Sequence, residues 1–229
     1  MTNAKPNIQR TVIILLCVIV VIVGAMVSRI LRTPDAVIVA PAPAAQVSSQ
    51  ALSALQESGV FVRPQAKTLA AFELTDEQGQ PFGNQQFEGQ WSLVFLGFTH
   101  CPDICPTTLA LFKKLHASAS GTDSPLSAVQ YVLLSADPER DTAEKLSSYL
   151  DYFDKEFVGL TGTVADVDRL AKQLNSLFAR VPLVDGDYLI DHSANIMIIN
   201  PAGQYQGFIR QPHSVEQIKE AMLTITSSY

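Results

Sequence analysis

The chain contains few cysteines. Only three occur among 229 residues, and Cys17 lies in an apolar stretch near the N-terminus, so Cys101 and Cys105 form a single pair in the rest of the sequence. One pair is too few for a small domain held together by disulfides, and it suits one redox or metal site instead.

Runs of basic residues are also missing after the apolar stretch. The 16 Lys and Arg residues are outnumbered by 22 Asp and Glu residues, which gives a net charge of -6. This balance argues against a nucleic-acid partner. The length and apolar content suffice for one domain of ordinary size beside one membrane segment, and no internal repeat is visible.

Charged residues are absent from positions 11 to 28. With Ile30 and Leu31 this stretch approaches the roughly 20 residues that cross a bilayer. It predicts a transmembrane anchor at residues 11–31, preceded by a cytoplasmic tail at residues 1–10. A cleaved signal peptide is the alternative, because small residues follow at 40–44, but the apolar core of a signal peptide usually has only about 7 to 15 residues.

Proline and alanine are frequent in residues 32–60, which predicts a semi-extended tether with a short surface helix at 47–59 closed by Gly59. Basic residues are nearly balanced across the apolar segment, so the orientation rests on the short basic tail, which is typical of a signal anchor. No arginine- and serine-rich leader precedes it. This favours the bacterial inner membrane, with residues 61–229 in the periplasm, over the mitochondrial inner membrane.

Strands and helices are predicted to alternate through residues 61–229. An apolar run at 93–98 is typical of a buried strand, and an amphipathic helix starts after it, beside the cysteines. Asp137 is interpreted as a helix N-cap, with Pro138 at the first helical position. The order predicts an α/β, thioredoxin-like fold with insertions. Strands are expected at 72–75 and 80–82 (a hairpin), 93–98, 129–135, 157–160, 188–192, 195–199 and 204–209 (the last two a hairpin at the sheet's edge), and later helices at 138–153, 164–178 and 214–226.

The two cysteines lie four residues apart at the predicted turn from strand to helix. Unpaired N–H groups at a helix N-terminus lower a thiol's pKa, so at least one of the two should ionise easily. Three uses compete: a structural disulfide, a catalytic dithiol, or two soft metal ligands. A disulfide across three intervening residues would constrain the unfolded chain little.

A metal site requires a further ligand, and the chain has four histidines. His100, His116 and His213 are interpreted as surface or packing residues. His192 is expected at the end of a strand, near the cysteine turn, with Asp191 beside it. Two thiolates and one imidazole suit Cu(I), with Cu(II) also accessible, while zinc is the chemical alternative.

Four motifs carry a resemblance to a known family. GFTHCPDICP at 97–106, DPERDT at 137–142, VGLTGT at 158–163 and YLIDHS at 188–193 occur in order, and the similarity covers about residues 65–225. The chain resembles the SCO/SenC family of membrane-anchored, copper-binding assembly factors for cytochrome c oxidase. The resemblance implies a thioredoxin-like fold in which Cys101, Cys105 and His192 bind copper.

The resemblance also implies a metallochaperone that passes one copper ion to the dinuclear copper site of an oxidase subunit. Its expected partners are that copper-accepting subunit and, in addition, another copper chaperone or a thiol reductant. A thiol-disulfide oxidoreductase, with Cys101 and Cys105 as the redox pair, is the alternative, and a redox or copper sensor is a third. Against a redox enzyme, this chain has CxxxC rather than CxxC and no proline just before Ile196.

Overall fold

The structure is a computed structural model, and it describes residues 16, 18–24, 26, 48–119, 124–184, 186–227 and 229. The chain divides into two units, residues 1–44 and 45–229. In the first unit the described residues are helical and exposed, and no helix of the described residues is long and apolar enough to cross a membrane. The tail predicted at 1–10, much of the predicted anchor and the tether up to residue 47 lie outside the described residues.

The second unit is built around an eight-stranded sheet with the order β1-β10-β9-β4-β5-β6-β2-β3. The strands β4, β5 and β6 run parallel at its centre, and the other pairs are antiparallel. Two further strands, β7 and β8, form a separate antiparallel sheet. The strands are β1 Val60–Thr68, β2 Glu73–Asp76, β3 Pro81–Gly83, β4 Ser92–Gly97, β5 Gln130–Ser135, β6 Val158–Thr161, β7 Phe178–Pro182, β8 Tyr188–His192, β9 Ile196–Ile199 and β10 Gln204–Ile209.

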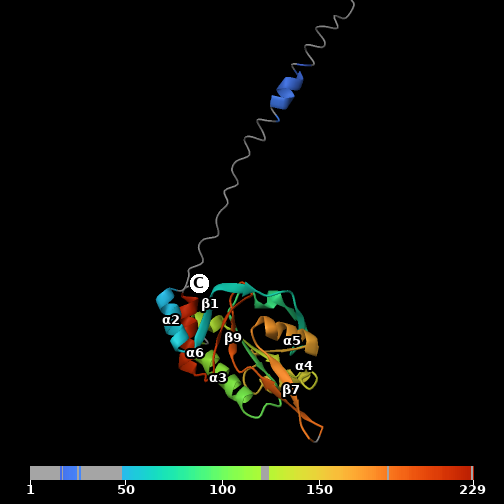
Figure 1. Cartoon of the computed structure of the whole chain (residues 1–229), viewed down its shortest axis with the longest axis vertical. Coiled ribbons are helices and arrows are strands. Elements are labelled where there is room, and N and C mark those ends of the chain that lie inside the picture. Colours follow the sequence, from blue (N-terminus) through green and yellow to red (C-terminus); the bar gives the residue numbers. More distant parts are fainter. Residues whose placement is uncertain are drawn as a thin grey trace, which may run out of the picture. The chain divides into compact units, whose positions relative to one another are not determined.

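Helices cover both sides of the strands (Figure 1), with α2, α3 and α6 on one side and α4 and α5 on the other. All six residues of β4 are buried, as a central strand covered on both faces requires. The helices are α2 Ser49–Glu57, α3 Ile104–Ala119, α4 Ala143–Leu150, α5 Val164–Gln173 and α6 Val215–Thr226, with 3-10 turns at Asn84–Phe87 and Pro125–Ala128. This arrangement places the end of β4 and the start of α3, where the cysteines lie, against the sheet core.

Several elements follow the sequence predictions closely. The hairpin of β2 and β3 is present, and α2 ends just before Gly59, whose φ is 83°. The closing helix α6 has Ser214 as its N-cap and Gln217 in a capping box. These features depend on local chemistry, which is why sequence patterns find them.

The helix predicted at 138–153 is wrong in its start. The helix α4 begins at Ala143, with the Thr142 hydroxyl accepting from the N–H of Lys145. Asp137 is therefore not its N-cap. Residues 138–140 form a turn, and the carboxylate of Asp137 is buried and bonded to other side chains.

Two other predictions need correction. The helix predicted to reach residue 178 ends at Gln173, because Asn175 adopts a left-handed φ of 58° and the chain continues into β7. The hairpin of β9 and β10 is not at the sheet's edge, because β1 pairs with the outer side of β10. The strand β1 was not expected, since Pro64 and an irregular register break its pattern.

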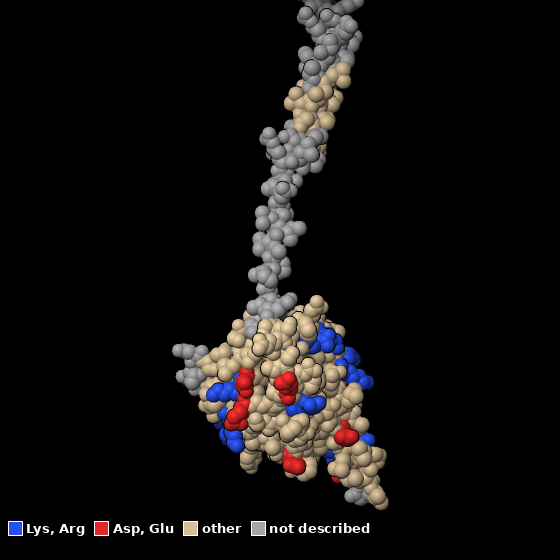
Figure 2. All heavy atoms as spheres, turned by 60° about the vertical axis from the view of Figure 1, so that its left-hand side comes forward, with Lys and Arg blue, Asp and Glu red and all other residues tan. Residues whose placement is uncertain are grey.

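One face of the domain carries charged side chains of both signs. Figure 2 shows most of one face as neither acidic nor basic, with Asp and Glu scattered among Lys and Arg.

Candidate metal centre

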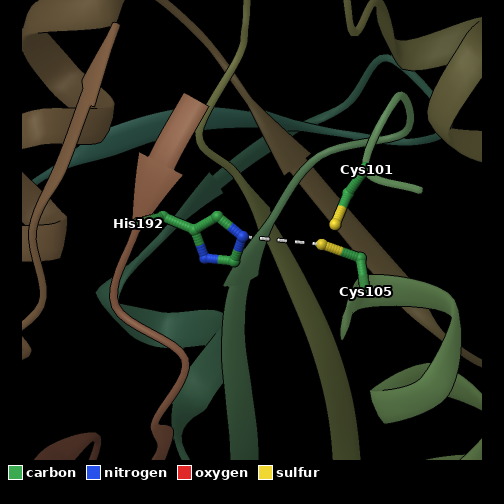
Figure 3. Close-up of side chains that lie close together, drawn as sticks. All are labelled: Cys101, Cys105 and His192. Atoms are coloured by element: carbon green, nitrogen blue, oxygen red, sulfur yellow. Dashed lines mark hydrogen bonds between the residues drawn. The ribbon is translucent and has the colours of Figure 1, made fainter. Parts of the chain in front are cut away.

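The two cysteines flank the turn that follows β4. Cys101 lies in the loop, where its N–H donates to the carbonyl of Phe98 at 3.2 Å, and Cys105 lies in the first turn of α3. Both are free thiols; Cys105 is buried and Cys101 half-buried. The spacing of four residues brings both sulfurs to the same side of the turn, as Figure 3 shows.

His192 comes from the separate sheet of β7 and β8. It is the last residue of β8, and its ring points at the cysteines (Figure 3). The ring lies edge-on to two aromatic side chains, with centroid distances of 5.9 Å to Phe95 and 5.7 Å to Phe98. These two aromatic side chains therefore hold the imidazole facing the thiols.

The hydrogen bonds of His192 fix which ring nitrogen can bind a metal. Its Nδ1 lies 3.1 Å from the carbonyl oxygen of Ser193, and a carbonyl oxygen can only accept. Nδ1 therefore carries the proton, and Nε2 presents its lone pair 3.7 Å from the sulfur of Cys105. A backbone acceptor that fixes the tautomer of the ring is the usual arrangement around a metal-binding histidine.

The three donor atoms are close enough to share one ion. One ligand atom from each of Cys101, Cys105 and His192 lies within 4.8 Å of the other two. No other group of three or more His, Cys, Asp or Glu residues with this property occurs in the part of the chain that the structure describes. The three residues expected from the sequence are thus brought together.

Protonation in this pocket depends on burial. Burial raises the pKa of the Cys105 thiol well above its usual range, and the neighbouring Cys101 thiol raises it further. Cys105 therefore does not ionise easily, because desolvation outweighs the helix N-terminus. Burial also lowers the pKa of His192, which keeps its imidazole neutral near pH 7. A positive ion bound to the sulfurs would be needed to hold Cys105 as a thiolate.

A buried carboxylate holds the cysteine loop in place, and no role was predicted for it from the sequence. Asp141 is fully buried and accepts from the N–H of Thr99 at 3.0 Å, from the hydroxyl of Thr99 at 2.5 Å and from the hydroxyl of Ser135 at 2.8 Å. Thr99 lies two residues before Cys101. Asp141 thus ties the loop to the end of β5, and Thr99, 42 positions away, is too distant in sequence for a local pattern to reveal it as a partner.

The sheet that carries His192 is fastened in a similar way. Asp137, also fully buried, accepts from the hydroxyl of Tyr188 at 2.8 Å and from Nε of Arg140. The guanidinium of Arg140 lies 3.9 Å from the centre of the Tyr188 ring, and that of Arg180 lies 4.5 Å from it. Because Tyr188 begins β8 and His192 ends it, this cluster positions the strand that presents the imidazole.

The remaining histidines lie apart from the cysteines. His100 contacts the ammonium of Lys145 at 3.0 Å, and His213 contacts the carbonyl of Ile209 at 3.2 Å. His116 lies between two carboxylates, 2.8 Å from Asp154 and 3.2 Å from Glu156. None of the three belongs to the candidate metal group.

The fold and the three donors define the class of protein: a thioredoxin-like domain with a candidate Cys2His metal site. The model of the SCO1/SenC family matches residues 62–227. This is well over half of the chain, so the chain belongs to the SCO1/SenC family. The resemblance inferred from four short motifs is thereby confirmed.

Individual relatives agree with this assignment. A putative copper-binding protein of Stutzerimonas stutzeri is 36% identical over 168 residues, which cover 73% of this chain and 81% of that protein. The mouse mitochondrial SCO2 homolog is 38% identical over 156 residues, which cover 66% of this chain and 59% of the mouse protein. The chain thus spans somewhat over half the length of that mitochondrial relative.

Solved structures show the same fold. The crystal structure of Arabidopsis thaliana ScoI with copper bound matches with a TM-score of 0.63 and 28% identity, over 70% of this chain and 98% of that one. Bradyrhizobium japonicum ScoI with copper bound matches with a TM-score of 0.61 and 30% identity, over 71% of this chain and 100% of that one.

Proposed function

We propose that the domain binds one copper ion through Cys101, Cys105 and His192 and delivers it to the copper-accepting subunit of a cytochrome c oxidase. The observation that carries this proposal is the meeting of three donor atoms within 4.8 Å on a thioredoxin-like fold. Two sulfurs and one neutral imidazole are soft and borderline donors, which suit Cu(I) and admit Cu(II). The copper-bound state of the two solved relatives supports copper over zinc.

Three protein ligands suit transfer as well as binding. A three-coordinate ion has room for an incoming thiolate, so it can pass to a partner by ligand exchange. Cys101 is the more exposed of the two thiols. An incoming ligand would therefore first meet the ion on the side of Cys101, while the buried Cys105 and the His192 ring form the inner wall.

The proposed setting is a membrane surface. Residues 11–31 would anchor the chain in a bacterial inner membrane, and the tether would let the domain reach a partner on the periplasmic side. The apolar segment free of charge from position 11 to 28 supports this.

The first experiment measures copper stoichiometry and Cu(I) affinity of the purified protein by competition against a chromophoric Cu(I) chelator. We expect one copper per chain in the wild type and loss of tight binding in Cys101→Ser, Cys105→Ser and His192→Ala. His100→Ala is the matched control, because His100 is next to Cys101 in sequence but contacts Lys145 instead of the donor group. Wild-type affinity in Cys105→Ser, with a folded protein, would contradict the proposal.

A thiol-disulfide oxidoreductase is the second candidate, because two free thiols lie within 4.8 Å of each other. Such an enzyme would reduce the cysteines of the oxidase subunit before copper arrives. The His192→Ala variant separates the two functions in cells. A copper carrier should lose oxidase assembly with this variant, whereas a reductase should lose it only when Cys101 or Cys105 is replaced.

A further inference from the structure

A basic pocket lies away from the cysteines, between α5, β1 and β10. Its volume is about 360 Å³, within the range of small-molecule sites, about 300 to 1,000 Å³. It exists because the ladder between β1 and β10 is interrupted between Val62 and Lys67, so that residues 63–66 leave the regular pairing. The left-handed turn at Asn175 closes the other side.

The charge of this pocket is opposite to that of the protein. Three cationic side chains line it, Arg63, Lys67 and Lys172, and no Asp or Glu is among its lining residues. Lys172 pairs with Asp168 at 2.7 Å, whereas Arg63 and Lys67 form no ion pair within the described residues and donate to backbone carbonyls. In a chain with a net charge of -6, a concave site with three cations predicts an anionic ligand.

The side chain of Gln173 forms part of the wall of the pocket. The side-chain oxygen of Gln173, a lining residue, accepts from the N–H of Ala70 at 2.5 Å. Its side-chain nitrogen is buried and has no acceptor among the described residues. Buried donors are rarely left without an acceptor, and an exception calls for an explanation. Because this nitrogen has almost no exposed surface, a ligand in the pocket would contact the cationic side chains and not this amide.

The wall of the pocket is partly apolar. The rings of Phe61 and Phe208 stack with their centroids 4.9 Å apart, and both residues line the cavity. A ligand that combines an anionic group with a less polar substituent would satisfy both parts of the lining.

We propose that this pocket binds a phosphate group, with Arg63, Lys67 and Lys172 pairing with its oxygens. Guanidinium and ammonium groups together are a common means of phosphate recognition. The phosphate can come from inorganic phosphate or from the headgroup of an anionic phospholipid. The site goes beyond the proposed copper function and uses none of its residues.

The test uses the full chain. Amide hydrogen exchange in segments 60–68 and 172–178 is measured by mass spectrometry. One arm compares inorganic phosphate with chloride at equal ionic strength, in detergent. The other compares nanodiscs of phosphatidylcholine alone with nanodiscs containing phosphatidylglycerol. If inorganic phosphate slows exchange in both segments and phosphatidylglycerol does not, free phosphate is the ligand. If phosphatidylglycerol slows exchange in both segments, the ligand is a lipid headgroup. Protection by neither, in a folded protein, overturns the proposal.

Two variants test the lining residues. Arg63→Gln combined with Lys67→Gln and Lys172→Gln should weaken phosphate binding by about tenfold or more. The control replaces Lys114, Lys155 and Lys219 by Gln, which removes the same charge from exposed positions elsewhere and should leave binding near that of the wild type. Equal weakening in both triple variants would show that net charge, and not the pocket, attracts phosphate, and would overturn the proposal.

Gln173→Glu is the second variant, and it guards against misfolding of the triple variant. Glutamate keeps an acceptor for the N–H of Ala70 but places a negative charge in the wall. Phosphate binding should be lost while the Tm stays within a few degrees of the wild type. Copper affinity should be unchanged in every variant, so a failure of the copper proposal and a failure of this one give different results.

Discussion

Replacing Gly97 by alanine should disturb the metal centre from inside the sheet. Gly97 is the last residue of β4 and is buried. A Cβ atom at this position would lie 2.9 Å from the sulfur of Cys105, 2.9 Å from the ring of Phe95 and 3.1 Å from a methyl of Leu133. These separations are too short to persist, so the added methyl must displace the thiol, the ring or the strand.

The size of the effect follows from overpacking. An extra methyl in a well-packed core costs about 1–3 kcal/mol of the free energy of unfolding. In a protein of this length each kcal/mol lowers the Tm by about 2–4 °C. Because one displaced atom is a proposed metal ligand, Cu(I) affinity should also fall, by about tenfold for every 1.4 kcal/mol of strain in the bound site.

Gly159→Ala provides the matched control. Its Cβ would lie 2.9 Å from Leu150 and 3.1 Å from Leu146, and none of the atoms near it belongs to the three donors. Thermal unfolding and chelator competition would be measured on both variants. Both should lose stability, and only Gly97→Ala should lose Cu(I) affinity. Wild-type affinity in Gly97→Ala, or an equal loss in both, would refute the reasoning.

Four further predictions concern groups around the site and the core. Asp141→Ala removes a buried acceptor of three hydrogen bonds, so it should lower the free energy of unfolding in urea by about 3 kcal/mol or more. A loss below about 1 kcal/mol would contradict the role of Asp141 in holding the cysteine loop. Tyr149→Phe deletes a buried hydroxyl that has no partner among the described residues and should leave the Tm unchanged or raise it; a marked drop would reveal a hidden acceptor. Tyr188→Phe should weaken Cu(I) binding several-fold with little loss of global stability, because it loosens the strand of His192, and unchanged affinity would count against that coupling. Burial alone would raise the pKa of Asp154, but hydrogen bonds from His116 and from a backbone N–H lower this pKa overall. The carboxylate therefore stabilises the fold above its unfolded pKa of about 3.9, and this stabilisation disappears as the pH falls through the lower folded pKa. Asp154→Asn should be less stable than the wild type at pH 7 and equally stable in acid, and a difference that stays constant with pH would refute the linkage.

The sequence led to Cys101, Cys105 and His192, which the structure brings together, because the signals for them are short. The spacing of Cys101 and Cys105 and the strand before them are local features, and His192 was found by a motif and by its position at the end of a strand. The central strands β4 and β5 were found because buried parallel strands are continuously apolar.

Other features depend on partners far away in the chain. Asp137 follows a strand and precedes a proline, which is the pattern of an N-cap, but its carboxylate bonds Tyr188, which lies 51 positions later. Asp141 reaches Thr99 across 42 positions. No window of neighbouring residues contains this information. The strand β1 was missed for a different reason, since its interrupted register hides the alternation of a regular strand.

The sheet of β7 and β8 gives metal binding a mechanical consequence. The two sulfurs belong to the loop after β4, whereas the imidazole belongs to a two-stranded ribbon that shares no backbone ladder with the main sheet. An ion held by all three side chains would therefore act as a cross-link between two separately hydrogen-bonded parts of the domain. Without the ion, the ribbon would be held to the segment 137–140 by the Tyr188–Asp137 hydrogen bond and by the ion pairs of Arg140 with Asp187 and of Arg180 with Glu139.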